Sequence, residues 1–443
     1  MKIQLSDHFT FGKLIRFTLP SIAMMVFTSI YGVVDGFFVS NFIGKSEFAA
    51  VNFIFPLIMM LAAFGFMFGA GGSALVAKTL GEGDRERANK LFSMIVYVSI
   101  IVGVIVSTLG IVFIRPIAAM LGAEGDMLEN CVIYGRIILA TLVPFMLQME
   151  FQSFFITAEK PKLGLFVTLA SGITNMVLDA LLVAVFPLGI VGAALATTLS
   201  QAVGGFVSLG YFCTRNSSLL KLSKPSFDGR ALLKTCTNGS SELMSNISMS
   251  LVSMLYNFQL MKYADENGVA AYGVLMYVGF IFISIFIGYS IGTAPLIGFN
   301  FGSGNRQELR NLLNKSFIII GSTSVSMLVL SLALSSPMSG IFVGYDPELL
   351  VMTVQALYIY SWSFLFCGMA IFGSSFFTAL NNGLISAIIS FMRTLVFQVA
   401  AVLILPLILD ISGIWFSVVV AEFLSFVVTL VFIIGQRKKY KYL

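Results

Sequence analysis

Long apolar segments recur along the whole chain, and they constrain its fold more than any other feature. Twelve of them, separated by short charged or Gly- and Pro-rich stretches, lie near residues 14–40, 49–77, 92–114, 131–157, 163–187, 189–212, 232–262, 270–298, 312–335, 350–378, 384–408 and 412–435. Each is long enough to cross roughly 30 Å of hydrocarbon as an α-helix. The chain is 58% hydrophobic and 11% charged, whereas a typical soluble domain is roughly 25% charged. The sequence therefore predicts an all-α integral membrane protein with twelve transmembrane helices.

The basic residues are distributed unevenly between the loops. Of the 26 Lys and Arg residues, 21 fall in the N-terminal segment, in alternate loops or in the C-terminal tail, which lie on one side of a twelve-helix topology. Because basic loops stay in the cytoplasm, both termini are predicted to be cytoplasmic. The net charge of +5 is thus a topological signal, and no nucleic-acid partner is expected.

Residues that would support catalysis or metal binding are scarce. The four cysteines lie far apart without a CxxC pair, and the single histidine, His8, precedes the first apolar segment. The sequence contains no HExxH pattern, so no zinc site is indicated. Its GxSxG match, Gly288–Gly292, lies inside an apolar segment predicted to be helical, without the strand-to-helix turn that exposes a nucleophile. We expect a protein that is not an enzyme and that has no cofactor.

The two halves of the chain resemble each other at a constant offset of 221 residues. At this offset Lys13 matches Lys234, Gly81–Arg85 matches Gly302–Arg306, and Ile190–Gly192 matches Ile411–Gly413, without a gap. Six helices in each half give the halves the same orientation in the membrane, with a cavity between them. We predict an N-terminal lobe over 1–213, a cytoplasmic linker over 214–231 and a C-terminal lobe over 232–443.

Six ionisable residues lie inside apolar segments: Asp35, Glu150, Asp179, Glu242, Arg393 and Glu422. Each costs roughly 2.5 to 3.5 kcal/mol near the centre of a membrane helix, so each requires a reason. Counting residues from the outer helix ends places Asp35, Asp179 and Thr197 at a similar depth, roughly 8 to 12 Å below the outer surface. Asn175 precedes Asp179 by four residues and shares its helix face. These four side chains can bind a small hard cation such as Na⁺, or share a proton.

The cluster is absent from the second half. At the 221 offset its four members become Tyr256, Val396, Ala400 and Val418. Ion coupling is therefore predicted to reside in the N-terminal lobe alone. The alternative is that Asp35 and Asp179 only form structural hydrogen bonds with neighbouring helices.

Other polar residues in apolar segments are candidates for the central cavity or for coupling. Gln201 matches Glu422 at the repeat offset, so both are predicted to line the cavity, together with Glu242 and Arg393. For Arg393, Glu422 is a candidate neutralising partner. Pro20 removes a backbone hydrogen bond from the first helix and should kink it, which makes it a candidate hinge below Asp35.

The sequence resembles the multidrug and toxic compound extrusion (MATE) family over nearly its whole length. The matching stretches are Leu19–Pro20, Val34–Asp35, Gly81–Asp84, Ala158–Pro161, Asn175–Asp179 and Gly192–Thr197. The resemblance implies two six-helix lobes and an N-lobe cation site at Asp35, Asn175, Asp179 and Thr197. It also implies alternating access and export of cationic or amphipathic compounds in exchange for H⁺ or Na⁺. Glu242 lies near, but not on, the position of the acid that some branches of the family keep in helix 7.

The predicted function is secondary active efflux of small cationic or amphipathic molecules from a bacterial cell, by a monomer in the inner membrane. A flippase for a lipid-linked precursor, known in the wider superfamily, is the main alternative. Such a flippase should line its cavity with several basic residues, whereas Arg393 is the only basic residue expected inside the membrane. A passive channel is disfavoured because coupling acids confined to one lobe suit gated exchange better than a continuous pore.

Overall fold

The computed structural model describes residues 3–442, apart from the side chains of residues 45 and 46, and this part of the chain is helical without strands. Residues 1–2 and 443, at the outer limits of the two predicted lobes, lie outside the described residues. The helices are α1 (Phe11–Phe42), α2 (Lys45–Gly81), α3 (Arg85–Met120), α4 (Gly125–Ala140), α5 (Leu142–Thr157), α6 (Pro161–Asp179), the π-helical η1 (Ala180–Val185), α7 (Gly189–Cys213), α8 (Gly229–Gly302), α9 (Arg306–Val343), α10 (Pro347–Ser361), α11 (Phe364–Ala379), α12 (Gly383–Phe391), the π-helical η2 (Met392–Val396), α13 (Phe397–Ile404) and α14 (Pro406–Tyr440).

These elements form twelve membrane crossings within the described residues. Nine continuous helices are long and apolar enough to cross, and two pairs, α4 with α5 and α10 with α11, qualify as spans bent by 55° and 50°. The 74 residues of α8 would extend about 110 Å as one helix, far beyond a bilayer. Non-helical backbone at Ala264 and Asp265 divides α8 into two crossings. A similar break at Asp410 places the first residues of α14 in the preceding crossing.

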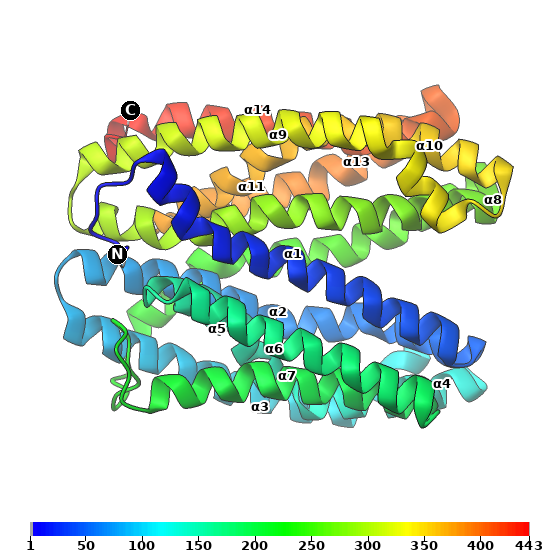
Figure 1. Cartoon of the computed structure of the whole chain (residues 1–443), viewed down its shortest axis with the longest axis horizontal. Helices are drawn as coiled ribbons and strands as arrows, with labels where there is room; N and C mark the ends of the chain where they lie inside the picture. Colours follow the sequence, from blue (N-terminus) through cyan, green and yellow to red (C-terminus); the bar gives the residue numbers. More distant parts are fainter. Residues whose placement is uncertain (1–2, 443) are drawn as a thin grey trace.

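The crossings form two bundles, each with its own apolar core. One core contains buried residues between Val39 and Ala231, and the other contains buried residues between Val252 and Tyr442. Figure 1 shows the blue-to-green half of the chain beside the yellow-to-red half, with both termini at one end of the long axis. We call this end the terminal face and the opposite end the distal face. The separate cores mean that each half packs as a unit, and the exact lobe boundaries stay a prediction.

Helix caps reveal how the two halves correspond. Asp84 caps α3 and Asn305 caps α9, and each side-chain oxygen accepts a backbone N–H three residues later. The preceding Gly83 and Gly304 both have positive φ, as this turn requires. The two caps are 221 residues apart, as predicted. The loop before α6 matches at 222 instead, because Glu159 and Asn381 are the equivalent residues with positive φ.

The gap-free repeat predicted from the sequence is therefore wrong in the fourth and fifth crossings of each half, whereas the offset of 221 returns at Gly189 and Asp410, which both have positive φ. The π-helical segment η2 inserts a further residue into the eleventh crossing, before the level that corresponds to Asn175. Gln398 is then the structural counterpart of Asn175, and Val402 that of Asp179. The predicted counterparts Val396 and Ala400 are displaced by two residues.

The two lobes meet backbone to backbone near the terminal face. A Cβ atom at Gly81 would lie 2.0 Å from the carbonyl oxygen of Phe299, and one at Gly302 would lie 2.0 Å from that of Lys78. These two contacts are related by the 221-residue repeat, so they lie about the pseudo-two-fold axis. The same closeness recurs deeper in the bundle, at Gly71 with Thr235 and at Gly239 with Met67.

The N-terminal segment also joins the lobes at this face. The backbone N–H of Leu5 donates to Glu159 Oε1 at 2.8 Å, and that of Phe9 donates to Glu308 Oε1 at 2.9 Å. His8 Nδ1 lies 2.6 Å from the other carboxylate oxygen of Glu308. Because Glu159 precedes α6 and Glu308 begins α9, this segment bridges the two halves.

Residues 214–228 of the predicted linker have no helical structure, whereas residues 229–231 already belong to α8. The linker packs against α3, where Asn89 Oδ1 accepts the backbone N–H of Lys221 at 2.7 Å and Ser93 Oγ accepts that of Ser223 at 2.8 Å. These bonds satisfy backbone groups that the linker cannot satisfy by itself.

Candidate functional site

Two acids from different helices meet inside the N-terminal lobe. Asp35 lies on α1, and Asp179 ends α6 with Asn175 one turn before it. Asn175 and Asp179 are buried, and Asp35 is half-buried. The Asp35 carboxyl group faces Asp179 and Asn175 within interaction range. The structure therefore brings together three of the four side chains predicted from depth.

Four buried oxygen atoms of this cluster lack a hydrogen-bond partner. Asp35 Oδ1, Asn175 Oδ1 and both carboxylate oxygens of Asp179 are buried without a partner among the described residues. Two adjacent unpaired carboxylates in a low-dielectric interior are strongly unfavourable when both are charged. A shared proton or a bound small cation removes that cost. The cluster is thus suited to exchange charge with its surroundings.

Two tyrosines complete this cluster, and the sequence analysis missed both. Tyr134 on α4 is 4% exposed and lies near both carboxyl groups. Tyr31 lies one turn before Asp35 on α1 and interacts with its carboxyl group. The four-residue spacing to Asp35 was a usable signal for Tyr31. No sequence spacing connects Tyr134 with the acids.

Thr197 does not join the hydrogen-bonded surroundings of the acids. It lies half-buried on α7, and within the described part of the chain its hydroxyl group bonds to neither carboxyl group. Its helix, α7, packs closely against η1, since a Cβ at Gly192 would lie 2.5 Å from the carbonyl oxygen of Leu182. Its role as a cation ligand stays a prediction.

The C-terminal lobe contains a different arrangement. Arg393 Nε donates to both carboxylate oxygens of Glu422, at 3.1 and 2.9 Å, so the candidate pairing is present in the structure. Both side chains are largely buried, between η2 and α14. Glu242, half-buried on α8, lies within electrostatic range of Arg393. The charge of the arginine is thus balanced inside its own lobe.

The residue of the C-terminal lobe that is equivalent to Asp35 is uncharged, and its polar group is hydrogen-bonded. The hydroxyl group of Tyr256 donates to Gln398 Oε1 at 2.7 Å, and its ring stacks on Tyr272 with centroids 5.2 Å apart. Gln398 is the counterpart of Asn175. A neutral hydrogen-bonded pair therefore occupies the place of the Asp35–Asn175 pair.

The remaining predicted positions are buried. Gln201 and Glu422 are 7% and 5% exposed, and the amide oxygen of Gln201 has no hydrogen-bond partner in the described structure. Glu150 on α5 is fully buried, with Ser99 of α3 beside its carboxyl group. Pro20 is buried within α1, which continues as a single helix from Phe11 to Phe42. Their cavity and hinge roles stay predictions.

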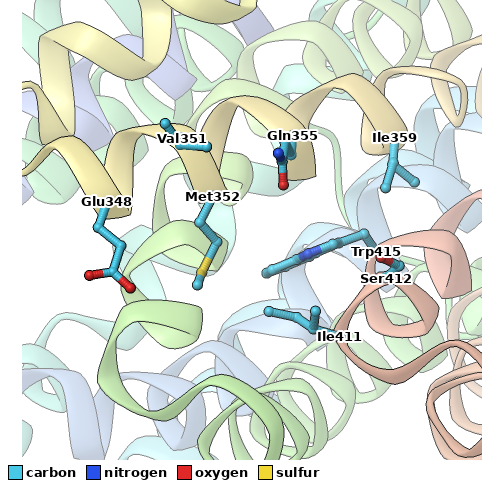
Figure 2. Close-up of a pocket in the computed structure, with 8 residues that line it drawn as sticks. All are labelled: Glu348, Val351, Met352, Gln355, Ile359, Ile411, Ser412 and Trp415. Atoms are coloured by element: carbon cyan, nitrogen blue, oxygen red, sulfur yellow. The ribbon is translucent and has the colours of Figure 1, made fainter.

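A surface cavity of about 260 Å³ lies elsewhere, in the C-terminal lobe between α10 and the start of α14. Figure 2 shows the Trp415 ring on one side of it and Gln355 pointing toward that ring from α10. The lining contains none of the predicted site residues. Among the described residues, no group of three or more His, Cys, Asp or Glu is placed to hold a metal ion. The oxygen atoms of the Asp35 cluster suit a proton or a monovalent cation instead.

Comparisons with known proteins agree with this architecture. The MatE family model matches twice, over residues 20–181 and 243–404, once in each half of the chain. The multidrug export protein MepA of Staphylococcus haemolyticus is 24% identical over 416 residues, which cover 93% of this chain and 90% of that protein. A crystal structure of a MATE protein in complex with MaL6 superposes with a TM-score of 0.93 at 22% identity, over 98% of both chains. An outward-facing multidrug resistance MATE transporter superposes with a TM-score of 0.92 at 22% identity, also over 98% of both chains. Because the family model covers most of the chain in two copies, this protein belongs to the MATE family of membrane transporters.

Proposed function

We propose that this protein exports cationic or amphipathic compounds by antiport with H⁺ or Na⁺, through alternating access. The observation that carries the proposal is the buried, unpaired cluster of Asp35, Asn175 and Asp179 in one lobe. A transporter that uses an ion gradient needs a group that gains and loses positive charge during each cycle, and this cluster has that property. The multidrug export activity named for the staphylococcal relative supports the substrate class.

The contacts of α1 give the cluster a way to act on the other lobe. Ser29 Oγ donates to the carbonyl oxygen of Phe280 on α8 at 3.5 Å, and Gly288 of α8 lies against Ser21 and Ile22. Binding of a proton or Na⁺ removes the repulsion between the acids, so α1 can pack more closely on α6. Any shift of α1 then changes its contact with α8. Ion and drug thus favour different arrangements of the same helix.

The proposed orientation places the terminal face in the cytoplasm of a bacterial cell, because the basic residues concentrate there. The protein would act as a monomer, since each chain supplies both lobes. A flippase for a lipid-linked precursor is less well supported. Its anionic substrate requires free basic groups, whereas Arg393 is bound by Glu422.

The test is transport in proteoliposomes, with the proton and sodium gradients imposed separately. A fluorescent lipophilic cation serves as substrate, and the Asp179→Asn variant serves as a matched control that keeps the shape of the side chain. We expect one gradient to drive accumulation in the parent and neither to do so in the variant. Transport that neither gradient drives in the parent would rule out antiport.

A further inference from the structure

A buried polar stripe runs along α6 from the acid cluster toward the terminal face. Thr168, Ser171, Asn175 and Asp179 follow at spacings of three or four residues, so they share one helix face. All four are buried, with exposures between 0% and 3%. The stripe extends about 16 Å along the helix axis. Structural packing alone does not require polar residues at every turn of this face.

The stripe continues onto α5 through a glutamine. Gln148 Nε2 donates to Ser171 Oγ at 3.2 Å, and Ser171 Oγ donates to the carbonyl oxygen of Ser200 on α7 at 2.7 Å. Gln152 lies one turn further toward the terminal face on α5, on the same side as Gln148. Hydrogen bonds therefore join α5, α6 and α7 in the middle of the polar series, and Gln152 extends the series by one turn.

Several atoms of this series lack partners. Asn175 Oδ1, Gln148 Oε1 and Gln152 Nε2 are buried without a hydrogen bond to any described residue. Buried polar atoms in proteins are normally bonded, and ordered water supplies the bond where protein does not. Gly204 lets the Gln148 side chain pack directly against α7, since a Cβ at that position would lie 2.5 Å from Gln148 Cδ. The unpaired atoms along the series are therefore positions where ordered water would bind.

The series is closed on two sides by aromatic rings. Toward the lobe interface, α1 covers the stripe, because a Cβ at Gly172 would lie 2.5 Å from the Phe27 ring. Toward the terminal face, Phe155 follows Gln152 by three residues and packs on Phe212 of α7, with ring centroids 5.1 Å apart. Gly164 of α6 lies against the Phe155 side chain. Phe155 therefore lies between the three helices that carry the polar series and closes the series toward the terminal face.

We propose that this series is the path by which the coupling ion moves between the Asp35–Asp179 cluster and the terminal face, with Phe155 as its gate. The path runs inside the N-terminal lobe, separate from the route of the substrate, and it rests on the proposed ion antiport. When a proton is the coupling ion, the carboxyl O–H bond breaks as a neighbouring water accepts the proton, and the carboxylate retains the electron pair. When Na⁺ is the coupling ion, the carboxamide oxygens coordinate it along the same path.

The path excludes the nearest other acid. Glu150 lies two residues from both Gln148 and Gln152, on a different side of α5, with its backbone against Gly69 of α2 and its carboxyl group beside Ser99. Substitution of Glu150 would therefore not test the proposed path.

The first arm of the test measures conduction. Gln148→Met removes the hydrogen-bonding groups at nearly constant volume, and Gln148→Glu restores two oxygen acceptors. Loss of one relay contact should slow ion-driven transport about tenfold in Gln148→Met, whereas the affinity for a fluorescent lipophilic cation stays unchanged. Gln148→Glu should recover most of the rate. Gln259→Met removes a buried glutamine from the C-terminal lobe and should transport at the parent rate.

The second arm measures the gate without any substrate. Phe155→Ala should increase the leak of protons, read by an internal pH-sensitive dye, or of Na⁺, read by a sodium-sensitive dye. Phe377→Ala, at the equivalent position of the C-terminal lobe, should leave both leaks at the parent level. A parent-level leak in Phe155→Ala together with a parent rate in Gln148→Met would overturn the path. This result differs from failure of the proposed antiport, in which the parent itself transports without a gradient, because the leak requires no substrate.

Discussion

The two lobes share one helical framework but treat buried charge in opposite ways. In the N-terminal lobe, Asp35 and Asp179 face each other and their buried oxygens lack donors. In the C-terminal lobe, Glu422 is held by Arg393, and Tyr256 bonds to Gln398 where the acid and amide would be. An acid with a permanent basic partner keeps its charge, whereas an acid without one must take up a proton or a cation. Under the proposed antiport, one lobe therefore changes its charge during transport and the other holds it constant.

The largest effect in this comparison should come from removing the ionisable groups of the N-terminal lobe. Asp35→Asn and Asp179→Asn keep the side-chain shape but cannot ionise, so each should abolish gradient-driven efflux. Membrane insertion and thermal stability should not fall, because each change removes an unpaired buried acid. Efflux in proteoliposomes at equal protein content checks the first expectation, and the melting temperature in detergent checks the second. Normal coupled transport by either variant would show that its acid is not needed.

The second largest effect is expected in the C-terminal lobe, where removal of a charge should lower the stability of the protein. Arg393→Gln leaves Glu422 buried without its partner, which costs about 3 to 5 kcal/mol in comparable buried pairs. The double variant Arg393→Gln, Glu422→Gln contains no charge at this position and should regain most of the lost stability. Thermal unfolding of the parent, the single variant and the double variant gives the comparison. A double variant as unstable as the single one would contradict the view that the pair only balances charge.

Much of this contrast could be predicted from the sequence, because charged residues stand out in apolar segments. Asp35, Asp179, Arg393 and Glu422 were all recognised in this way, and counting residues from helix ends placed the two aspartates at one depth. Tyrosine gives no such signal, since it is common at membrane interfaces and in cores. Tyr134 was therefore missed, although it lies beside both acids.

The fold could be predicted for the same reason, and the errors of that prediction are local. Apolar length and helix-capping residues identify the crossings and the repeat. A π-helical turn inserts one residue without any distinctive composition, so the offset between η2 and the end of the eleventh crossing could not be predicted. The result was a wrong counterpart for Asn175. The polar series through Gln148 and Ser171 was missed because uncharged polar residues are frequent in membrane helices, and only burial and missing partners single them out.

A third and smaller effect concerns the helix that carries Asp35. Pro20 has no counterpart in the C-terminal lobe, where Ser241 occupies the repeat position. Proline removes one helical hydrogen bond, so α1 can bend there at modest cost. Pro20→Ala should stiffen α1 and slow turnover more than it weakens drug binding. The measurement is drug affinity beside efflux rate at low and high pH. Unchanged turnover with an unchanged pH dependence of affinity would remove bending of α1 from the mechanism.

The smallest effect is expected at Tyr256, and it tests whether coupling is confined to one lobe. Tyr256 occupies the repeat position of Asp35, and its hydroxyl group donates to Gln398. Tyr256→Phe removes that bond but leaves the stacking on Tyr272, so the expected loss is about 1 kcal/mol of stability. Gradient-driven efflux should stay near the parent level, because no exchangeable charge is lost.

The matched comparison is Asp35→Asn, assayed in the same vesicles with both gradients. If the lobes differ as described, Asp35→Asn stops transport and Tyr256→Phe does not. Loss of coupling in Tyr256→Phe as complete as in Asp35→Asn would mean that the C-terminal pair also takes part in ion exchange. Charge balance by Arg393 would then not be enough to keep this lobe passive, because a neutral tyrosine and glutamine would be relaying the ion.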